Sequence, residues 1–517
     1  MKTYKTRTFR SVSAFRGSIF GMNTTIKTVR RSLVVALVAT GVFPTSASAT
    51  NGFFSHGWGT NSKAMAGVAT ALPQDTLVSA TNPAGMAFIG NRFDVGVAFF
   101  SPSPRGYEAN NDFATQSVQT PGGSVNMPAG AFVTPGDYES RLDWFLIPSF
   151  GYNYVLDDRS TIGFSLFANG GMNTKYNDRP PFENFAVFPN QRVGPYPDGS
   201  IGPYFDFSSG QPMPVTAEVP GTVNGNPNGV FTATTPTGIN LEQLFIEIPY
   251  TYRLDGGKQS VGIAPVLAVQ RFEATGLEPF MQLSVRPDKV TNNGMDWSYG
   301  MGLHFGWFGQ INDQLALGAS YRTKVWMSKF DDYAGLFADG GSFDIPAMFN
   351  LGVAFKVQPN LTLAFDYQHI FYDENHAIAN SNDADLTACQ VAGPKPSYCL
   401  GAESGVGFGW ESMDVLKLGL KYDPIEQLSL MAGVSYNTDF LKTDRQGLFN
   451  ILAPATIRWH LTLGAAYQAT KTDEFAISFA YMPKETFDGT SPSLTQVQTG
   501  SLYMEQMEIG VGWSHRF

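Results

Sequence analysis

The sequence predicts an all-β protein, a 14-stranded antiparallel transmembrane β-barrel plugged by a small N-terminal hatch. Three observations support this prediction. An export signal is followed by no apolar run long enough for a membrane helix, apolar and polar residues alternate through most of the chain, and a compact apolar segment precedes the first strand. A transmembrane strand needs one lipid-facing apolar side and one polar or packed side, and strand side chains alternate between the two.

The end of the chain shows this alternation most clearly. Met507, Ile509, Val511 and Trp513 point to one side of a strand, and the residues between them are Glu508, Gly510 and Gly512. One side is therefore apolar and the other is polar or small. A strand of a soluble sandwich alternates in the same way, so this segment alone leaves both interpretations open.

The N-terminus has the layout of a secretory signal. Residues 1–49 contain eight Lys or Arg and no Asp or Glu, and an apolar run, Leu33 to Phe43, leads to Ala47-Ser48-Ala49. The run is shorter than the roughly 20 residues that span a bilayer, although an anchor that stays attached is the alternative. We expect a mature chain that begins at Thr50, with Met22 as a possible start of the signal. An exported chain with many strands favours the bacterial outer membrane as its location.

Charge and cysteine content narrow the possible functions. Removing the eight positive charges of the signal from a net charge of −10 leaves −18, which argues against nucleic acid as a partner. Cys389 and Cys399 are the only cysteines. We expect a disulfide between them, because the exported compartment is oxidising; two free thiols are the alternative. Two cysteines are too few for a metal site, and we expect no metal and no cofactor.

Fourteen strand-like segments follow between residues 92 and 517. We expect strands at 92–102, 142–156, 160–171, 243–253, 259–275, 295–310, 314–327, 344–357, 361–372, 412–423, 427–437, 455–469, 474–483 and 505–517. Short turns alternate with long connections, which are expected near 172–242, 373–411 and 438–454. One rim of short turns and one of long extracellular loops is typical of a membrane barrel. Aromatic residues near strand ends, among them Trp326, Tyr372, Trp410 and Trp513, fit interfacial girdles.

Residues 50–91 do not alternate as a strand would. They are too apolar for a disordered tail, and Asn82-Pro83-Ala84 is a turn signal. The simplest place for a compact apolar segment before a barrel is the barrel interior. A periplasmic arm is the alternative.

Two segments resemble a known family. Residues 50–91, with Asn-Pro-Ala-Gly-Met just before the first strand, resemble the hatch of the FadL/TodX-type transporters of fatty acids and hydrocarbons. Residues 163–171, Gly-Phe-Ser-Leu-Phe-Ala-Asn-Gly-Gly, are similar to the strand of that family that kinks inward and opens a gap in the barrel wall. The resemblance implies a fourteen-strand barrel plugged by a hatch. It also implies a lateral opening at Asn169, Gly170 and Gly171; an ordinary β-bulge at Gly170 and Gly171 is the alternative.

The resemblance also implies roles for other residues. Asn82, Pro83 and Ala84 would hold the hatch in place, and Phe53 and Phe54 would contact the ligand. Phe182, Phe185 and Phe188 lie in the long 172–242 insertion and would line an apolar extracellular groove. Packing of the plug and self-packing of the loop are the respective alternatives.

The expected function is passive uptake of long-chain fatty acids or other hydrophobic compounds through the outer membrane. Ligand would pass from the groove to the plugged lumen and leave sideways through the kink, because apolar molecules gain nothing by crossing a water-filled pore. We expect a monomer in contact with outer-membrane lipid and lipopolysaccharide. A polar-solute porin is the first alternative. An outer-membrane lipase is the second, but the sequence has no Gly-x-Ser-x-Gly elbow, and we expect no enzyme.

Overall fold

The structure is a computed structural model. It describes residues 50–517, apart from 113–114, 121–122, 129–132, 183–192, 196–200, 204–232, 385, 391–393, 442–446 and 493–496. The predicted signal therefore lies outside the described residues. Among those described, no helix combines the length and apolar character required to cross a bilayer.

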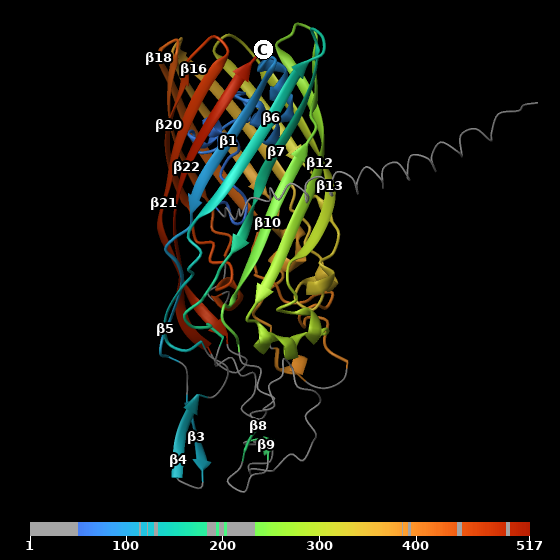
Figure 1. Ribbon diagram of the computed structural model, residues 1–517, viewed down its shortest axis with the longest axis vertical. Coiled ribbons are helices and arrows are strands. Elements are labelled where there is room, and N and C mark those ends of the chain that lie inside the picture. Colours follow the sequence, from blue (N-terminus) through green and yellow to red (C-terminus); the bar gives the residue numbers. More distant parts are fainter. Residues whose placement is uncertain are drawn as a thin grey trace, which may run out of the picture. The chain divides into compact units, whose positions relative to one another are not determined.

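A closed antiparallel barrel dominates the described chain (Figure 1). Eighteen strands form its sheet; four of them (β2, β5, β11 and β15) are short continuations, so the wall has fourteen strands among the described residues. Sequential wall strands pair with one another, and β1 pairs with β22 from Arg92↔Arg516 to Ser101↔Met507, which closes the cylinder. The predicted fold class is confirmed, and closure leaves no open sheet edge along the paired wall.

The wall strands are β1 (Arg92–Ser101), β6 (Phe145–Val155), β7 (Ser160–Asn173), β10 (Gly238–Glu247), β12 (Gln259–Thr275), β13 (Asp296–Gln310), β14 (Leu315–Arg322), β16 (Met348–Gln358), β17 (Leu361–Ile370), β18 (Met413–Ile425), β19 (Leu428–Asn437), β20 (Trp459–Gln468), β21 (Asp473–Pro492) and β22 (Val497–Arg516). The continuations are β2 (Arg105–Ala109), β5 (Gly136–Glu139), β11 (Tyr250–Arg253) and β15 (Trp326–Met327). Two separate hairpins are β3–β4 (Thr115–Thr120 and Gly123–Pro128) and β8–β9 (Val193–Pro195 and Ile201–Pro203).

Short helices lie in the interior segment and in the long loops. The α-helices are α2 (Thr60–Lys63), α3 (Ala338–Gly341), α4 (His376–Ala379) and α5 (Gly447–Asn450). The 3-10 helices are η1 (Thr76–Ala80), η2 (Pro83–Phe88), η5 (Glu278–Leu283), η6 (Pro287–Lys289), η7 (Asp331–Tyr333), η8 (Tyr372–Glu374) and η9 (Leu386–Gln390).

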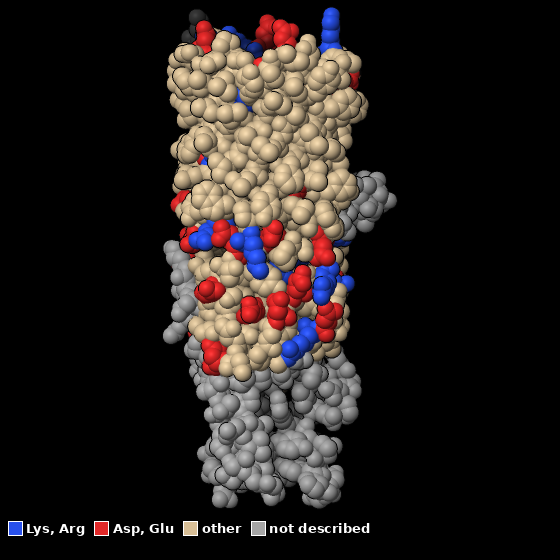
Figure 2. Space-filling model, turned by 90° about the vertical axis from the view of Figure 1, so that its left-hand side faces the viewer, with Lys and Arg blue, Asp and Glu red and all other residues tan. Residues whose placement is uncertain are grey.

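The outer surface carries a band of apolar side chains. Leu418, Phe365 and Ile477 are 48%, 42% and 51% exposed, and they alternate along their strands with buried residues. Figure 2 shows this band free of Lys, Arg, Asp and Glu over most of its height, with charged residues at the short-turn rim and again below the band. The alternation in β22 also has the predicted sense, because Ile509 and Val511 are exposed. This face is the one that contacts lipid.

Replacing Leu418 with arginine tests this assignment. A cation at the bilayer midplane of such a barrel costs about 2–4 kcal/mol, so Leu418→Arg should reduce the unfolding free energy by that amount. Denaturant unfolding in lipid vesicles measures the loss. Leu418→Met is the control and should change little; equal stability of the arginine variant would contradict a lipid-facing Leu418.

Two features differ from the sequence prediction. β21 and β22 are twenty residues long, far longer than the predicted 474–483 and 505–517, and with β2 and β5 they extend beyond the apolar band. Outside lipid, nothing requires the alternation on which the prediction depended. Tyr372 and Trp410 were expected in an interfacial girdle but are 0% and 1% exposed, packed inside the cylinder, so that assignment was wrong.

Residues 50–91 lie within the cylinder, in its upper half in Figure 1. α2 packs against β20, β21 and β22; η1 packs against β1, β6 and β7; and η2 packs against β7, β11, β12 and β13. Added Cβ atoms at Gly318 and Gly433 would meet Thr70 and Met65, which extends the contacts to β14 and β19. A segment can contact strands all around a closed wall only from inside. We call residues 50–91 the interior segment.

Candidate functional site at the gap between β6 and β7

The wall pairing between β6 and β7 stops before either strand ends. The pairing runs from Val155↔Thr161 to Ser149↔Phe167 and ends there. β6 nevertheless continues to Phe145, still paired with β1, and β7 continues to Asn173, still paired with β10. Further along, Arg141 N donates to Lys175 O at 2.8 Å, so the chains meet again. Residues 145–148 and 168–173 therefore border a window, which we call the wall gap.

The predicted kink residues lie at the wall gap. The register of β7 with β10 shifts between Ala168↔Leu244 and Gly170↔Gln243, which makes Asn169 the extra residue of a β-bulge. The Asn169 side chain is fully buried and points inward, where its Nδ2 donates to Gln243 Oε1 at 2.9 Å. A bulge bends its strand, and here the bend separates β7 from β6.

The start of the interior segment takes the place of the missing strand neighbour. Gly171 N donates to Phe53 O and Ser55 N donates to Asn169 O, each at 2.9 Å. Backbone groups at membrane depth require partners, and residues 53–55 supply them for β7. Gly170 permits this approach, because a Cβ there would lie 1.7 Å from Phe53 O. The interior segment therefore fills the wall gap from within.

Both predicted phenylalanines are in this plug. Phe53 and Phe54 are fully buried, with ring centroids 5.2 Å apart. Phe53 also packs against Tyr372 at 5.1 Å and Trp410 at 6.1 Å, which continue into the aromatic interior below the long loops. Their position at the junction of wall gap and aromatic lumen fits ligand contact as well as plug packing.

The predicted groove residues are only partly described. Phe182 is fully buried and its ring centroid lies 4.9 Å from that of Phe280, which in turn packs on Phe449 at 5.4 Å. Phe185 and Phe188 lie outside the described residues. Phe182 thus belongs to one apolar cluster with Phe280, in the loop that follows β12, and Phe449, in the 438–454 loop.

Arg322 is a functional candidate that the sequence reasoning missed. Its side chain is fully buried on β14, its Nη2 donates to Asn169 Oδ1 at 3.1 Å, and its guanidinium lies over the ring of Phe245 at 4.6 Å. Nε and Nη1 have no hydrogen-bond partner, and no carboxylate oxygen lies within 4.0 Å, among the described residues. Its neighbour Tyr321 points outward. Because side chains alternate along a strand, this position predicts that Arg322 points into the lumen.

A buried acid and imidazole lie near Arg322. Glu247 Oε1 and His304 Nδ1 are 3.2 Å apart, and both side chains are fully buried. Glu247 Oε2 and His304 Nε2 have no partner within the described chain. The region behind the wall gap therefore combines aromatic faces with polar atoms that have no hydrogen-bond partner among the described residues.

Asn82, Pro83 and Ala84 fasten the interior segment to β11, β12 and β13, the part of the wall that follows β7. Asn82 caps η2 through its Oδ1, which accepts from Ala84 N at 3.1 Å, and its Nδ2 donates to Thr70 O and Trp307 O. The carbonyls of Pro83 and Ala84 accept hydroxyl hydrogen bonds from Thr251 and Ser260. This geometry fits the anchoring role that was expected of them.

Charged side chains anchor the other half of the segment. Asp366 on β17 accepts hydrogen bonds from Ala69 N, Thr70 N and Thr70 Oγ1 at 2.9, 2.9 and 2.8 Å. Lys63 Nζ lies 2.8 Å from Glu508 on β22, and both side chains are buried. The sequence alternation placed Asp366 on the polar side of its strand, but its partners could not be predicted because they are about 300 residues away.

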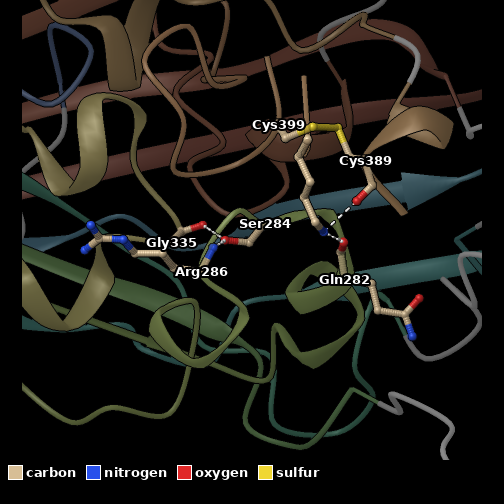
Figure 3. The surroundings of a disulfide bond; sticks show 7 residues. Gln282, Ser284, Arg286, Gly335, Cys389 and Cys399 are labelled. Carbon is tan, nitrogen blue, oxygen red and sulfur yellow. Dashed lines mark hydrogen bonds between the residues drawn. A yellow bond between two sulfur atoms is a disulfide. The ribbon is translucent and has the colours of Figure 1, made fainter. Parts of the chain in front are cut away.

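A disulfide between Cys389 and Cys399 closes a small loop within the 373–411 loop (Figure 3). Lys395, within the loop that they close, donates to the carbonyls of Gln282 and Cys389. Partial burial lowers the pKa of Lys395. Beside it, Ser284 Oγ donates to Gly335 O at 2.6 Å and accepts from Arg286 N at 2.9 Å. The Lys395 bond to Gln282 ties the 373–411 loop to the loop that follows β12, and the Ser284 bond to Gly335 ties the latter to the loop that follows β15.

Two cavities border the interior segment. A cavity of about 20 Å³ lies at the wall gap between Trp58, Ile147, Pro148 and Phe167. A larger one, of about 330 Å³, opens at the short-turn rim. The larger cavity is lined by Asn61, Leu72, Pro73, Gln74, Phe88, Ile89, Arg92, Lys421, Ser429, Met431, Ala466, Glu474 and Arg516. No group of three or more His, Cys, Asp or Glu suited to a metal ion occurs in the described chain.

Comparison with known proteins agrees with this geometry. The family model described as outer membrane protein transport protein (OMPP1/FadL/TodX) matches residues 281–510. The search of curated proteins gave no match. Sequence and fold together confirm the predicted resemblance and the outer-membrane location.

Solved structures share the fold at low sequence identity. The toluene transporter TodX of Pseudomonas putida is 17% identical with a TM-score of 0.55, and the match covers 89% of this chain and 99% of TodX. A FadL homologue of Pseudomonas aeruginosa is 13% identical with a TM-score of 0.56, covering 90% and 100%. The toluene transporter TbuX of Ralstonia pickettii is 15% identical with a TM-score of 0.50, covering 89% and 99%.

Proposed function

We propose that this chain, an outer-membrane barrel similar to the OMPP1/FadL/TodX transport proteins and a channel for hydrophobic compounds, takes up amphiphiles that carry a carboxylate, such as long-chain fatty acids. Uptake is by passive diffusion from the apolar loop cluster into the aromatic lumen. The substrate then leaves sideways into the membrane through the wall gap.

Arg322 is the observation that supports a carboxylate. A buried guanidinium is costly unless a partner meets its charge and donors, and here Nε and Nη1 have none within the described chain. A carboxylate is the ligand group that suits such donors best. The aromatic side chains around Arg322 can bury an alkyl chain, and each buried methylene contributes about 0.8 kcal/mol to binding. A purely hydrocarbon ligand would leave Nε and Nη1 of Arg322 without an acceptor among the described residues.

The wall gap supports the lateral route. Leaving through it requires that residues 53–58 move away from β7, which breaks the backbone hydrogen bonds of Gly171 and Ser55 and the bond from Trp58 Nε1 to Ala168 O. Pro148, on the facing edge of β6, has no N–H and so leaves no donor unpaired there when the plug moves. The interior segment, meanwhile, remains anchored by Asn82 and Asp366. The same segment fills the lumen, which works against the alternative of an open polar porin.

The barrel is proposed to act as a monomer surrounded by lipid. β1 and β22 of one chain close the wall, and apolar side chains are exposed on strands all around it. Charged residues bound the apolar band in Figure 2, at the level where lipid and lipopolysaccharide head groups would contact it.

Substitution of Arg322 tests the substrate class. Arg322→Gln keeps a hydrogen-bonding group but removes the charge, and it should weaken dodecanoate binding by about 1.5–3 kcal/mol, or roughly tenfold or more. Arg322→Lys should keep part of the affinity. Binding and uptake of dodecanoate and of toluene are to be measured side by side in proteoliposomes.

Toluene serves as the internal control, because it has no carboxylate. Undiminished dodecanoate binding by Arg322→Gln would contradict a carboxylate site and favour hydrocarbons as the substrate class. Equal loss of both ligands would make Arg322 a packing residue.

A further inference from the structure

A second polar region lies on the side of the interior segment opposite Arg322. It is formed by residues of the interior segment and by inward-facing residues of three wall strands, all of them at most 5% exposed. We call this group the polar seam. Its members are His56, Asn61, Ser62, Ser435, His460 and Ser478.

Each member has side-chain atoms for which the protein provides no partner. The ring nitrogens of His56 and His460, the Oγ atoms of Ser62, Ser435 and Ser478, and Asn61 Oδ1 make no hydrogen bond within the described chain. The His56 ring lies near the backbone of Lys63 and the His460 ring near that of Thr50, but neither reaches hydrogen-bond geometry. Buried polar atoms are normally hydrogen-bonded, so this group of unpaired atoms requires an explanation.

The two histidines and Ser435 form one end of the polar seam. His56 and His460 stack with ring centroids 5.7 Å apart, and Ser435 is the cross-strand partner of His460. Lys417, the partner of Ser435 on β18, donates to His56 O at 3.0 Å. The rings thus lie where the interior segment meets β18, β19 and β20.

The polar seam also leads to the short-turn rim. α2, which contains Asn61 and Ser62, packs against β21, the strand of Ser478. Asn61 Nδ2 donates to Glu474 Oε1 at 3.4 Å, and both residues line the 330 Å³ cavity that opens at this rim. At its other end, the polar seam reaches Thr50, whose carbonyl accepts from Asn437 Nδ2. The members of the polar seam therefore lie between Thr50 and the cavity at the short-turn rim.

Wall side chains bind carbonyls of the interior segment on both sides. On the side of Arg322, Ser320 binds Thr81 and Arg253 binds Ala87. Beside the polar seam, Lys417, Asn437 and Thr462 bind the carbonyls of His56, Thr50 and Ala64, but the unpaired atoms of the polar seam take no part in these bonds. Buried polar atoms that lack protein partners are normally served by water, which makes about three hydrogen bonds per molecule.

We propose that the polar seam is a hydrated path that vents water from the lumen to the periplasm when substrate enters. This inference rests on the proposed function. A substrate molecule that enters a closed lumen must displace water. The wall gap opens to lipid, which does not accept water, and the long-loop end is the route of the incoming substrate. The polar seam is the remaining way out that polar atoms line.

Hydration is tested first, without substrate. Ser435→Cys and Ser478→Cys introduce a thiol into the polar seam, and hydrogen peroxide, a probe close to water in size, should oxidise both in the membrane-embedded protein. The matched control is Ser320→Cys, because Ser320 is a buried lumen serine whose hydroxyl is bonded to Thr81 O. Mass spectrometry measures the oxidised fraction. Oxidation of the two thiols no faster than at position 320 would overturn the proposal, whatever the substrate is.

Venting is tested second. Ser435→Leu fills the polar seam and should slow dodecanoate uptake several-fold without changing its equilibrium affinity, whereas Ser435→Ala should behave as the parent protein. Ser478→Val is the second variant, in case Ser435→Leu does not fold, as judged by heat-modifiable gel mobility. Unchanged uptake overturns venting, and so does a parallel loss of affinity, which would make the residue structural. Failure of the Arg322 test would leave the peroxide result valid.

Discussion

Replacing Gly170 with valine should force residues 53–55 out of the wall gap. A Cβ at this position would lie 1.7 Å from Phe53 O, and the backbone φ of 156° is one that only glycine adopts readily. The hydrogen bonds from Gly171 N to Phe53 O and from Ser55 N to Asn169 O should both be lost, at about 0.5–1.5 kcal/mol each. Phe53 would also leave Tyr372 and Trp410, so substrate affinity should fall more than tenfold while the barrel still folds.

Hydrogen exchange followed by mass spectrometry measures the displacement. Peptides that cover residues 50–59 and 168–173 should lose protection in Gly170→Val, and dodecanoate binding gives the affinity. Gly257→Val is the matched control, since Gly257 also has a positive φ but has no neighbouring atom within 4 Å of an added Cβ. Parent-like protection and affinity in the Gly170 variant would show that residues 53–55 are not the plug of the wall gap.

Removing the Asp366 carboxylate should release the interior segment from β17. Asp366→Ala leaves two backbone N–H groups and the Thr70 hydroxyl without their acceptor, at about 1–3 kcal/mol for each buried group. It also removes an anion from the surroundings of buried Lys417, which adds to the cost. We expect a leaky barrel that admits small sugars, and liposome swelling measures the leak.

Asp366→Asn separates charge from shape. The amide oxygen still accepts hydrogen bonds, so the asparagine variant should be less leaky than the alanine variant. Asp488→Ala is a control, because Asp488 is an exposed acid on β21 beyond the apolar band. If Asp366→Ala remains as impermeable as the parent, then the remaining contacts hold the segment and Asp366 is not a main anchor.

Much of the barrel could be predicted from the sequence because lipid imposes a simple rule on it. Wherever a strand crosses the bilayer, as β17 and β18 do, apolar residues face outward at every second position, and these strands were predicted to within a few residues. The rule ends where the lipid ends. β2, β5 and the outer halves of β21 and β22 are paired strands without that alternation, so only the three-dimensional pairing reveals them.

The candidate site was predictable in position but not in mechanism. The resemblance pointed to Asn169, Gly170 and Gly171, and the bulge is found at Asn169. No residue pattern indicates that Phe53 O accepts a hydrogen bond from Gly171 N, because pairing across more than a hundred residues depends on how the segment folds inside the wall. Tyr372 and Trp410 were assigned to lipid interfaces because an aromatic residue at a strand end fits either a lipid interface or the barrel interior.

The pairing of β1 with β22 has a consequence for biogenesis. The two strands that seal the cylinder are the first and the last of its wall, so the seal cannot form until nearly the whole polypeptide has been synthesised. A chain truncated before β22 would leave β1 without this partner and expose an unpaired β-edge.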